Sequence, residues 1–200
     1  MPSCAIQTAT TSKRYGTVAR NVVGMGAASD AAAGAAQELL RDAFTRLIEH
    51  VDELTEGLTE DQAGYRPSPN ANSIAWLIWH SARVQDVQLT PIAGIEQVWT
   101  HEGWVDRFGL DLPRNDTGYG HGPEEVAKVQ ASADLLAGYY HAVHKVTLEF
   151  VARVTTEDLA RIVDRNWDPP VTASARLVSI IDDCAQHLGQ AAYLQGILPQ

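Results

Sequence analysis

Two stretches of the sequence carry residue types that can hold a divalent metal ion. His187 follows Asp183 by four residues, and residues at positions i and i+4 of a helix lie on the same face. His80 lies in a separate apolar stretch between Trp76 and Val84, so its imidazole is expected to point at least partly inward. Neutral imidazole is the commonest metal ligand in proteins, and a carboxylate on a buried face needs a partner. His80, Asp183 and His187 are therefore candidate ligands of a metal site with an open fourth position, as in catalytic zinc sites.

The same spacing has a plainer interpretation. An aspartate four residues before a histidine is common by chance, and His187 can be a core histidine that is hydrogen-bonded to Asp183 with no metal present. The spacing alone leaves both interpretations open. If a metal is bound, a His-Asp-His set suits zinc first, with nickel and iron as alternatives.

Three further residues are candidates for lining a pocket or supporting the ligands. Tyr140 and His144 lie on the inner stripe of a third helical segment, and Arg83 lies one turn beyond His80. Each has an alternative role. The two inner residues can be ordinary core side chains, and Arg83 can pair with Asp86 three residues on.

Four segments with apolar residues at every third or fourth position are expected to position these side chains. No convincing alternating pattern of strands occurs, so the sequence predicts an all-α bundle. We expect helices over residues 27–57, 72–91, 123–151 and 173–194. Asn72 or Ser73 would begin the second helix, which would end near Pro91, and the third would run for about thirty residues.

Residues 92–122 form a long irregular connection between the second and third helices. Trp99, Trp104 and Phe108 within it indicate that it packs onto the surface of the bundle. His101 and His121 also lie in this connection, where they can close over the site or have no role.

Composition excludes several classes of protein. The chain has 25 acidic and 15 basic residues and a net charge of −10, which argues against a nucleic-acid partner. No uninterrupted apolar stretch is long enough to span a membrane. Only Cys4 and Cys184 are present, which excludes a disulfide framework and a cysteine-based zinc finger. We expect a cytoplasmic, globular protein.

The first 26 residues differ from the rest, because they contain three basic residues and no acidic one. We expect residues 1–26 to be a flexible or non-native tail, with Met25 as a natural start, and residues 27–200 to form a single domain.

Two sets of motifs resemble the DinB-like family. The first is Leu-Thr-Glu-Asp-Gln at residues 58–62, followed by Arg66-Pro67, the Ser-Ile-Ala-Trp-Leu stretch at 73–77 and then His80. The second is Gln-His-Leu-Gly-Gln-Ala-Ala-Tyr at 186–193, followed by Gly196. The resemblance covers roughly residues 36 to 196.

The resemblance implies an up-down-down-up four-helix bundle with a long loop between helices 2 and 3, often found as a homodimer. It also implies a divalent metal held by one histidine on helix 2 and a pair on helix 4, here His80, Asp183 and His187. The first member of that pair is commonly histidine. An acid at this position resembles the mycothiol-dependent maleylpyruvate isomerases. Those enzymes also have a C-terminal domain with substrate contacts, which these 200 residues lack, so we do not expect that particular activity.

Two functions remain open at this point. In the first, the protein is a metal-dependent enzyme acting on small molecules, and the metal activates a low-molecular-weight thiol such as mycothiol or bacillithiol. The reaction would be thiol transfer to an electrophile or a thiol-assisted isomerisation. In the second, the protein is a non-catalytic helical module for ligand binding or dimerisation, with no bound metal.

Overall fold

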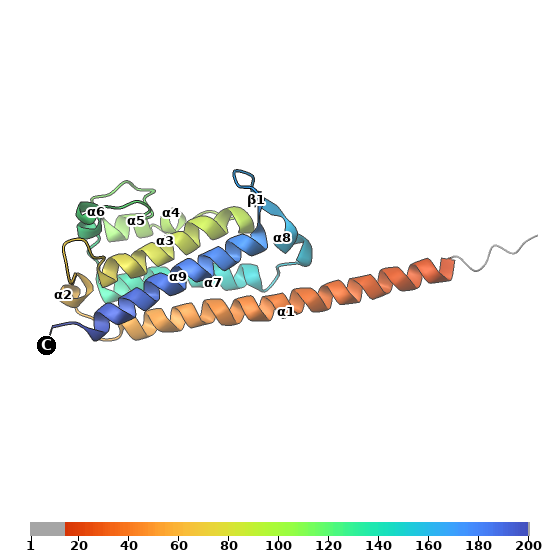
Figure 1. Ribbon diagram of the computed structural model, residues 1–200, viewed down its shortest axis with the longest axis horizontal. Coiled ribbons are helices and arrows are strands. Elements are labelled where there is room, and N and C mark those ends of the chain that lie inside the picture. Colours follow the sequence, from red (N-terminus) through yellow and green to blue (C-terminus); the bar gives the residue numbers. More distant parts are fainter. Residues whose placement is uncertain (1–14, 200) are drawn as a thin grey trace, which may run out of the picture.

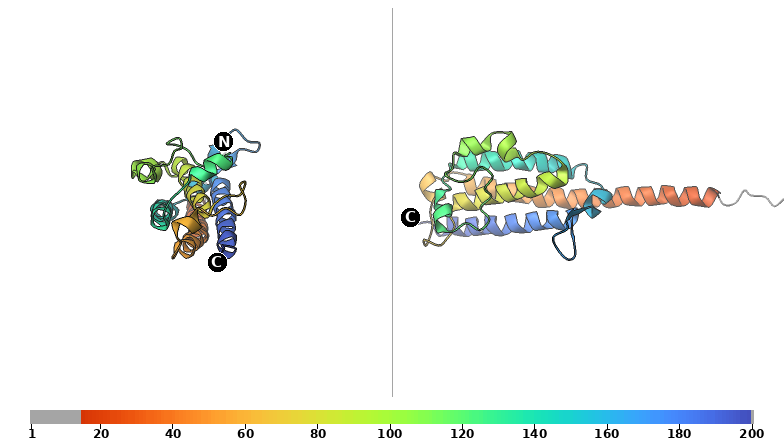
Figure 2. Two further views of the ribbon diagram at one scale, coloured as in Figure 1. Left: turned by 90° about the vertical axis from the view of Figure 1, so that its left-hand side faces the viewer. Right: turned by 90° about the horizontal axis from the view of Figure 1, so that it is seen from above.

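The computed structural model describes the backbone of residues 15–199 and the side chains from residue 28 onwards. Four long helices lie side by side, and shorter elements fill the connections (Figure 1). The long helices are α1 (Tyr15–Thr55), α3 (Ile74–Ala93), α7 (Ala133–Val151) and α9 (Ala173–Gly196). The end-on view in Figure 2 shows them as a bundle, which confirms the all-α prediction. In the described part of the chain, none of the helices combines the length and apolar character needed to cross a bilayer.

The direction of the helices confirms the up-down-down-up arrangement. α1 and α9 run one way, and α3 and α7 run the other (Figure 1). Because α3 and α7 are parallel, the chain must return along the whole bundle between them. The returning segment contains three short helices, α4 (Val98–His101), α5 (Trp104–Phe108) and α6 (Pro123–Lys128). The long connection is therefore more ordered than the irregular loop that was predicted, because its tryptophans and Phe108 are buried as expected.

The second predicted helix starts as expected and ends slightly later. The Ser73 side chain accepts a hydrogen bond from the backbone N–H of Trp76, as an N-cap does. The helix continues through Pro91 and ends at Gly94, whose φ of 69° gives a left-handed C-cap. A proline in the last turn removes only one backbone hydrogen bond, so it does not stop the helix there.

The prediction of a single third helix of about thirty residues is wrong. The segment is divided into α6 and α7, with Val129 at an extended ψ of 88° between them. Ser132 then caps a new helix by accepting a hydrogen bond from the N–H of Leu135. The apolar periodicity continues across the break because Val129 is itself fully buried, so the pattern could not reveal it.

Helix α8 (Thr156–Ala160) and a pair of short strands connect α7 to α9. Another short helix, α2 (Glu60–Ala63), lies between α1 and α3. Strands β1 (Ile162–Asp164) and β2 (Val171–Thr172), which were not predicted, pair antiparallel. Strands this short carry no readable alternation.

The N-terminal part of α1 runs past the other long helices (Figure 1). Ser29 and Gln37 connect α1 to the turn before α8, through hydrogen bonds to the Thr156 hydroxyl (2.8 Å) and the Val154 carbonyl (2.9 Å). Of the expected tail, residues 1–14 lie outside the described residues, and the backbone of 15–26 is helical. The division into a tail and a single domain stays a prediction.

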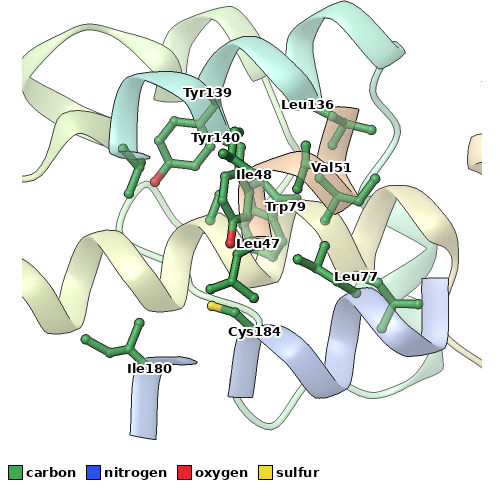
Figure 3. Close-up of a cluster of buried hydrophobic side chains, with 14 of the residues drawn as sticks. Leu47, Ile48, Val51, Leu77, Trp79, Leu136, Tyr139, Tyr140, Ile180 and Cys184 are labelled. Carbon is green, nitrogen blue, oxygen red and sulfur yellow. The ribbon is translucent and has the colours of Figure 1, made fainter. Parts of the chain in front are cut away.

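Apolar side chains from all four long helices form one core (Figure 3). α1, α7 and α9 each bury one stripe, as their periodicity predicted, whereas α3 is buried on all sides from Ile74 to Asp86. The side chains labelled in Figure 3 are Leu47, Ile48, Val51, Leu77, Trp79, Leu136, Tyr139, Tyr140, Ile180 and Cys184.

A buried ionic group attaches the returning segment to α3. The Asp86 carboxylate accepts hydrogen bonds from the backbone N–H groups of Val98 (3.0 Å) and Trp99 (2.8 Å) at the start of α4. It also accepts one from the Tyr139 hydroxyl (2.8 Å) and pairs with Arg83 at 3.4 Å. Both charged side chains are fully buried, so each depends on the other and on these bonds.

Arg83 also contacts three residues of the returning segment directly. Its guanidinium donates to the Asp116 carbonyl (2.9 Å) and to the Gln97 side chain (3.1 Å), and it lies 4.9 Å from the centre of a Trp99 ring. The structure therefore shows the pairing of Arg83 with Asp86 that was weighed as the alternative to a pocket role.

We expect replacement of Asp86 by alanine to lower the free energy of unfolding by about 3–5 kcal/mol, because it leaves the Arg83 charge buried and unpaired. Chemical denaturation measures this loss. Asp42→Ala is the matched control, since Asp42 pairs with Arg46 at 2.7 Å on an exposed surface and its loss should change stability little. Equal effects of the two substitutions would contradict the assigned role of Asp86.

Candidate metal centre

Helices α3 and α9 bring the three predicted ligands together. His80 comes from α3, and Asp183 and His187 come from successive turns of α9. One potential ligand atom from each residue lies within 4.8 Å of the other two. The ligand atoms of a tetrahedral zinc site lie about 3.4 Å apart, so the three side chains would have to move closer together to bind the ion. We call this group the metal cluster.

His80 is oriented by a backbone group of the returning segment. Its Nδ1 lies 2.5 Å from the Thr117 carbonyl oxygen, which can only accept, so Nδ1 carries the proton and Nε2 keeps a lone pair. The ring also stacks on Trp76, with centroids 4.6 Å apart. Burial lowers the pKa of His80 below its ordinary value, although the Thr117 carbonyl opposes the shift. His80 is therefore a neutral imidazole with one nitrogen available.

Asp183 and His187 interact, but the contact between their side chains is too long to be a good hydrogen bond. His187 Nδ1 donates to the Asp183 backbone carbonyl at 2.8 Å and lies 3.5 Å from Asp183 Oδ2, at the outer limit for a hydrogen bond. This interaction lowers the pKa of Asp183 and raises that of His187. Because Nδ1 donates to the Asp183 carbonyl, Nε2 is the His187 nitrogen that is left for a metal.

The clearest sign that the cluster suits a cation is the Asp183 carboxylate. Its Oδ2 atom is buried and has no hydrogen-bond partner. A buried acceptor without a partner costs about 1–3 kcal/mol, and more when it is charged. A divalent cation between Asp183 and the two histidines would remove this cost, so the residues present fit the metal that the resemblance implies.

A segment of the returning chain covers the cluster. His121 accepts a hydrogen bond at Nδ1 from the Trp76 indole N–H (3.1 Å) and donates from Nε2 to Asp116 (3.0 Å). Asp116 also accepts from the backbone N–H of Gly118 at 2.9 Å. These bonds hold Thr117 in place, and Thr117 in turn orients His80. The sequence left His121 without a definite role, because nothing in a loop pattern shows which helix it will meet.

Gly118 is the closest approach of this covering segment to the cluster. A Cβ atom at this position would lie 2.7 Å from His80 Nδ1 and 3.1 Å from the rings of Trp76 and Trp79. Its φ of 89° is also a conformation that side chains disfavour. Glycine is required here for two separate reasons.

The other predicted pocket residues lie away from the metal cluster. Arg83 belongs to the buried group with Asp86, and its side chain is fully buried there. Tyr140 lies in the core beside Cys184, where burial raises the pKa of both, that of Cys184 to about 12. His144 is half-buried near Asp52 of α1, and burial lowers its pKa. The role of these residues in lining a pocket or supporting the ligands stays a prediction, since periodicity showed that they face inward but not which neighbour they meet.

The remaining histidines are at the surface. His101 contacts Glu96 at 2.8 Å, and His141 contacts Asp52 at 2.7 Å, in both cases with largely exposed side chains. The expectation that His141 faces solvent is confirmed.

The bundle and its His-Asp-His cluster define a helical protein of the DinB-like class. The family described as mycothiol S-transferase matches residues 39–199. A crystal structure of a conserved protein from Enterococcus faecalis is 36% identical, with a TM-score of 0.74, over 79% of this chain and 94% of that one. No curated protein matches the chain. The chain therefore belongs to the mycothiol S-transferase family.

We expect Gly118→Ala to weaken zinc binding by about 10- to 100-fold, the usual effect of disturbing a group that orients a metal ligand. The added methyl group would displace either the covering segment or the His80 ring. Competition with a chromophoric chelator measures the affinity.

Gly120→Ala provides the matched control for this prediction. Gly120 also has a positive φ, of 78°, but nothing lies within 4 Å of a Cβ at that position. Equal zinc affinities of the two variants would contradict the role of Gly118.

Proposed function

We propose that this protein is a metal-dependent enzyme that transfers a low-molecular-weight thiol, of the mycothiol type, to a small electrophilic substrate. The observation that carries the proposal is the unpartnered Asp183 Oδ2 within reach of His80 and His187, in a chain of the mycothiol S-transferase family. A metal is the simplest partner for that oxygen.

His80, Asp183 and His187 would hold the metal, with zinc expected first and nickel or iron as alternatives. A divalent metal bound by three protein ligands supplies an open position and the positive charge that lowers the pKa of a thiol. Asp183 contributes one negative charge, so the set as a whole keeps the net positive charge that favours a thiolate.

The surroundings of the cluster give it one covered side and one open side. Trp76 and the segment around Gly118 cover His80, whose residue exposure is only 6%. The Asp183 side chain is 38% exposed, so solvent reaches part of the cluster on the α9 side. The Thr117 carbonyl keeps the His80 proton on Nδ1 throughout.

The described residues do not supply a reactive thiol, which fits a thiol that comes from a cosubstrate. Cys184 is the cysteine in the described part of the chain, and it is buried with a pKa raised to about 12. Its Sγ lies 3.4 Å from the Ser81 carbonyl, in the core of the bundle. A thiol so protected is not a nucleophile at neutral pH.

Metal content and thiol consumption test the proposal together. We expect about one metal per chain in protein purified without chelator. His187→Ala should lose the metal and at least about 100-fold of the rate of thiol transfer, since a metal supplies several kcal/mol to such a step. His141→Ala is the control, because His141 is an exposed histidine outside the cluster.

Two results would overturn the proposal. One is equal, substoichiometric metal in the wild type and His187→Ala, which would favour the non-catalytic module instead. The other is thiol consumption that chelation leaves unchanged. The homodimer and the cytoplasmic location stay predictions, for which sedimentation and fractionation are the measurements.

A further inference from the structure

A hollow of about 310 Å³ opens beside the N-terminal end of α3. Asn70, Asn72 and Gln190 contribute amide groups to its walls, and Leu77 and Leu194 contribute apolar surface. The two leucines are buried, while Asn70 and Gln190 are exposed to solvent. A small molecule bound here would contact buried apolar side chains at the bottom of the hollow and amide groups at its walls, which is the usual composition of a binding pocket.

This hollow adjoins the metal cluster. Leu77 precedes His80 by three residues on α3, and Gln190 follows His187 by three residues on α9. The two helices are antiparallel (Figure 1), so both displacements point the same way along the bundle. Three residues of helix correspond to about 4.5 Å. None of the cluster residues lines the hollow, so a molecule bound there would have to extend along the helices by about this distance to reach the cluster.

The lining of the hollow carries no charged side chain. Amide groups both donate and accept hydrogen bonds, which suits hydroxyl groups on a ligand. The Tyr193 ring, 69% exposed at the rim, offers a flat face to C–H groups. The other hollows that the structure describes each contain charged side chains, among them Glu149, Arg153, Arg161, Glu38 and Asp30.

Arg66 stabilises the backbone of the segment that carries Asn70 and Asn72. Its Nε donates to the Ala71 carbonyl at 2.6 Å, and its Nη atoms donate to the carbonyls of Pro69 and Pro123. These bonds fix the backbone of the wall before any ligand arrives. Because the Arg66 guanidinium donates to these carbonyl oxygens, it is not available to bind a ligand.

We propose that this hollow binds the neutral, polyhydroxylated part of the thiol cosubstrate, and so selects such thiols over thiols that carry carboxylates. The inference rests on the proposed function, because it places the rest of the molecule whose sulfur reaches the metal cluster. Mycothiol has this chemistry, since a glucosamine–inositol group without charge is attached to its cysteine. Bacillithiol carries the carboxylates of a malate group, for which the lining has no cation.

The test combines kinetics with direct binding. The double variant Asn72→Ala, Gln190→Ala should raise KM for mycothiol about 10-fold, from the loss of hydrogen bonds to hydroxyl groups, and leave kcat and metal content unchanged. KM for N-acetylcysteine, which lacks the sugar, should not change. Asn166→Ala is the control, because Asn166 is an exposed amide between β1 and β2.

Titration of the full chain with N-acetylglucosaminyl-inositol, which is uncharged and has no thiol, separates this inference from the proposed function. We expect saturable binding to the wild type and to Asn166→Ala, and binding at least about 10-fold weaker in the double variant. This result would support the hollow even if no thiol were consumed.

The inference is overturned if N-acetylglucosaminyl-inositol does not bind the wild type, or binds all three proteins equally. It is also overturned if the double variant raises KM equally for mycothiol and N-acetylcysteine, or if the wild type uses bacillithiol as well as mycothiol. Thermal unfolding monitored by circular dichroism checks that the double variant is folded.

Discussion

The antiparallel packing of α3 against α9 is the contact on which the candidate site depends. Cys184 of α9 contacts the Ser81 carbonyl of α3 within the core, and this register places His80 opposite His187. The same register sets Leu77 beside Gln190 one turn away. A core contact, a metal cluster and a hollow thus share one interface, so the apolar packing that stabilises the bundle also sets the geometry of the site.

The parallel course of α3 and α7 has a second consequence. It obliges the chain to travel back along the bundle, and the returning segment is held to α3 by buried charges rather than by apolar packing alone. Arg83 reaches the Asp116 carbonyl, and the Asp116 side chain in turn holds His121. The residues that hold the returning segment against α3 therefore also position Thr117 beside His80, so stability and the geometry of the candidate site are connected.

Much of the fold could be predicted from periodicity. The apolar stripes of α1, α7 and α9 and the cap at Ser73 are local features, and a local pattern records them directly. The division between α6 and α7 could not be predicted in the same way. The fully buried Val129 keeps the pattern apolar through the break, so the apolar periodicity alone does not show that one helix ends and another begins at the Ser132 cap.

For the site, the sequence by itself determined the ligand pair on one helix face, since a spacing of four residues fixes a shared direction within any helix. The place of His80 opposite that pair also followed once the resemblance was drawn. Tertiary structure alone decided that Asp183 Oδ2 is buried without a partner, that His121 and Gly118 cover the cluster, and that Arg83 belongs to the core. These depend on contacts between segments far apart in the chain, and spacing along one helix carries no information about them.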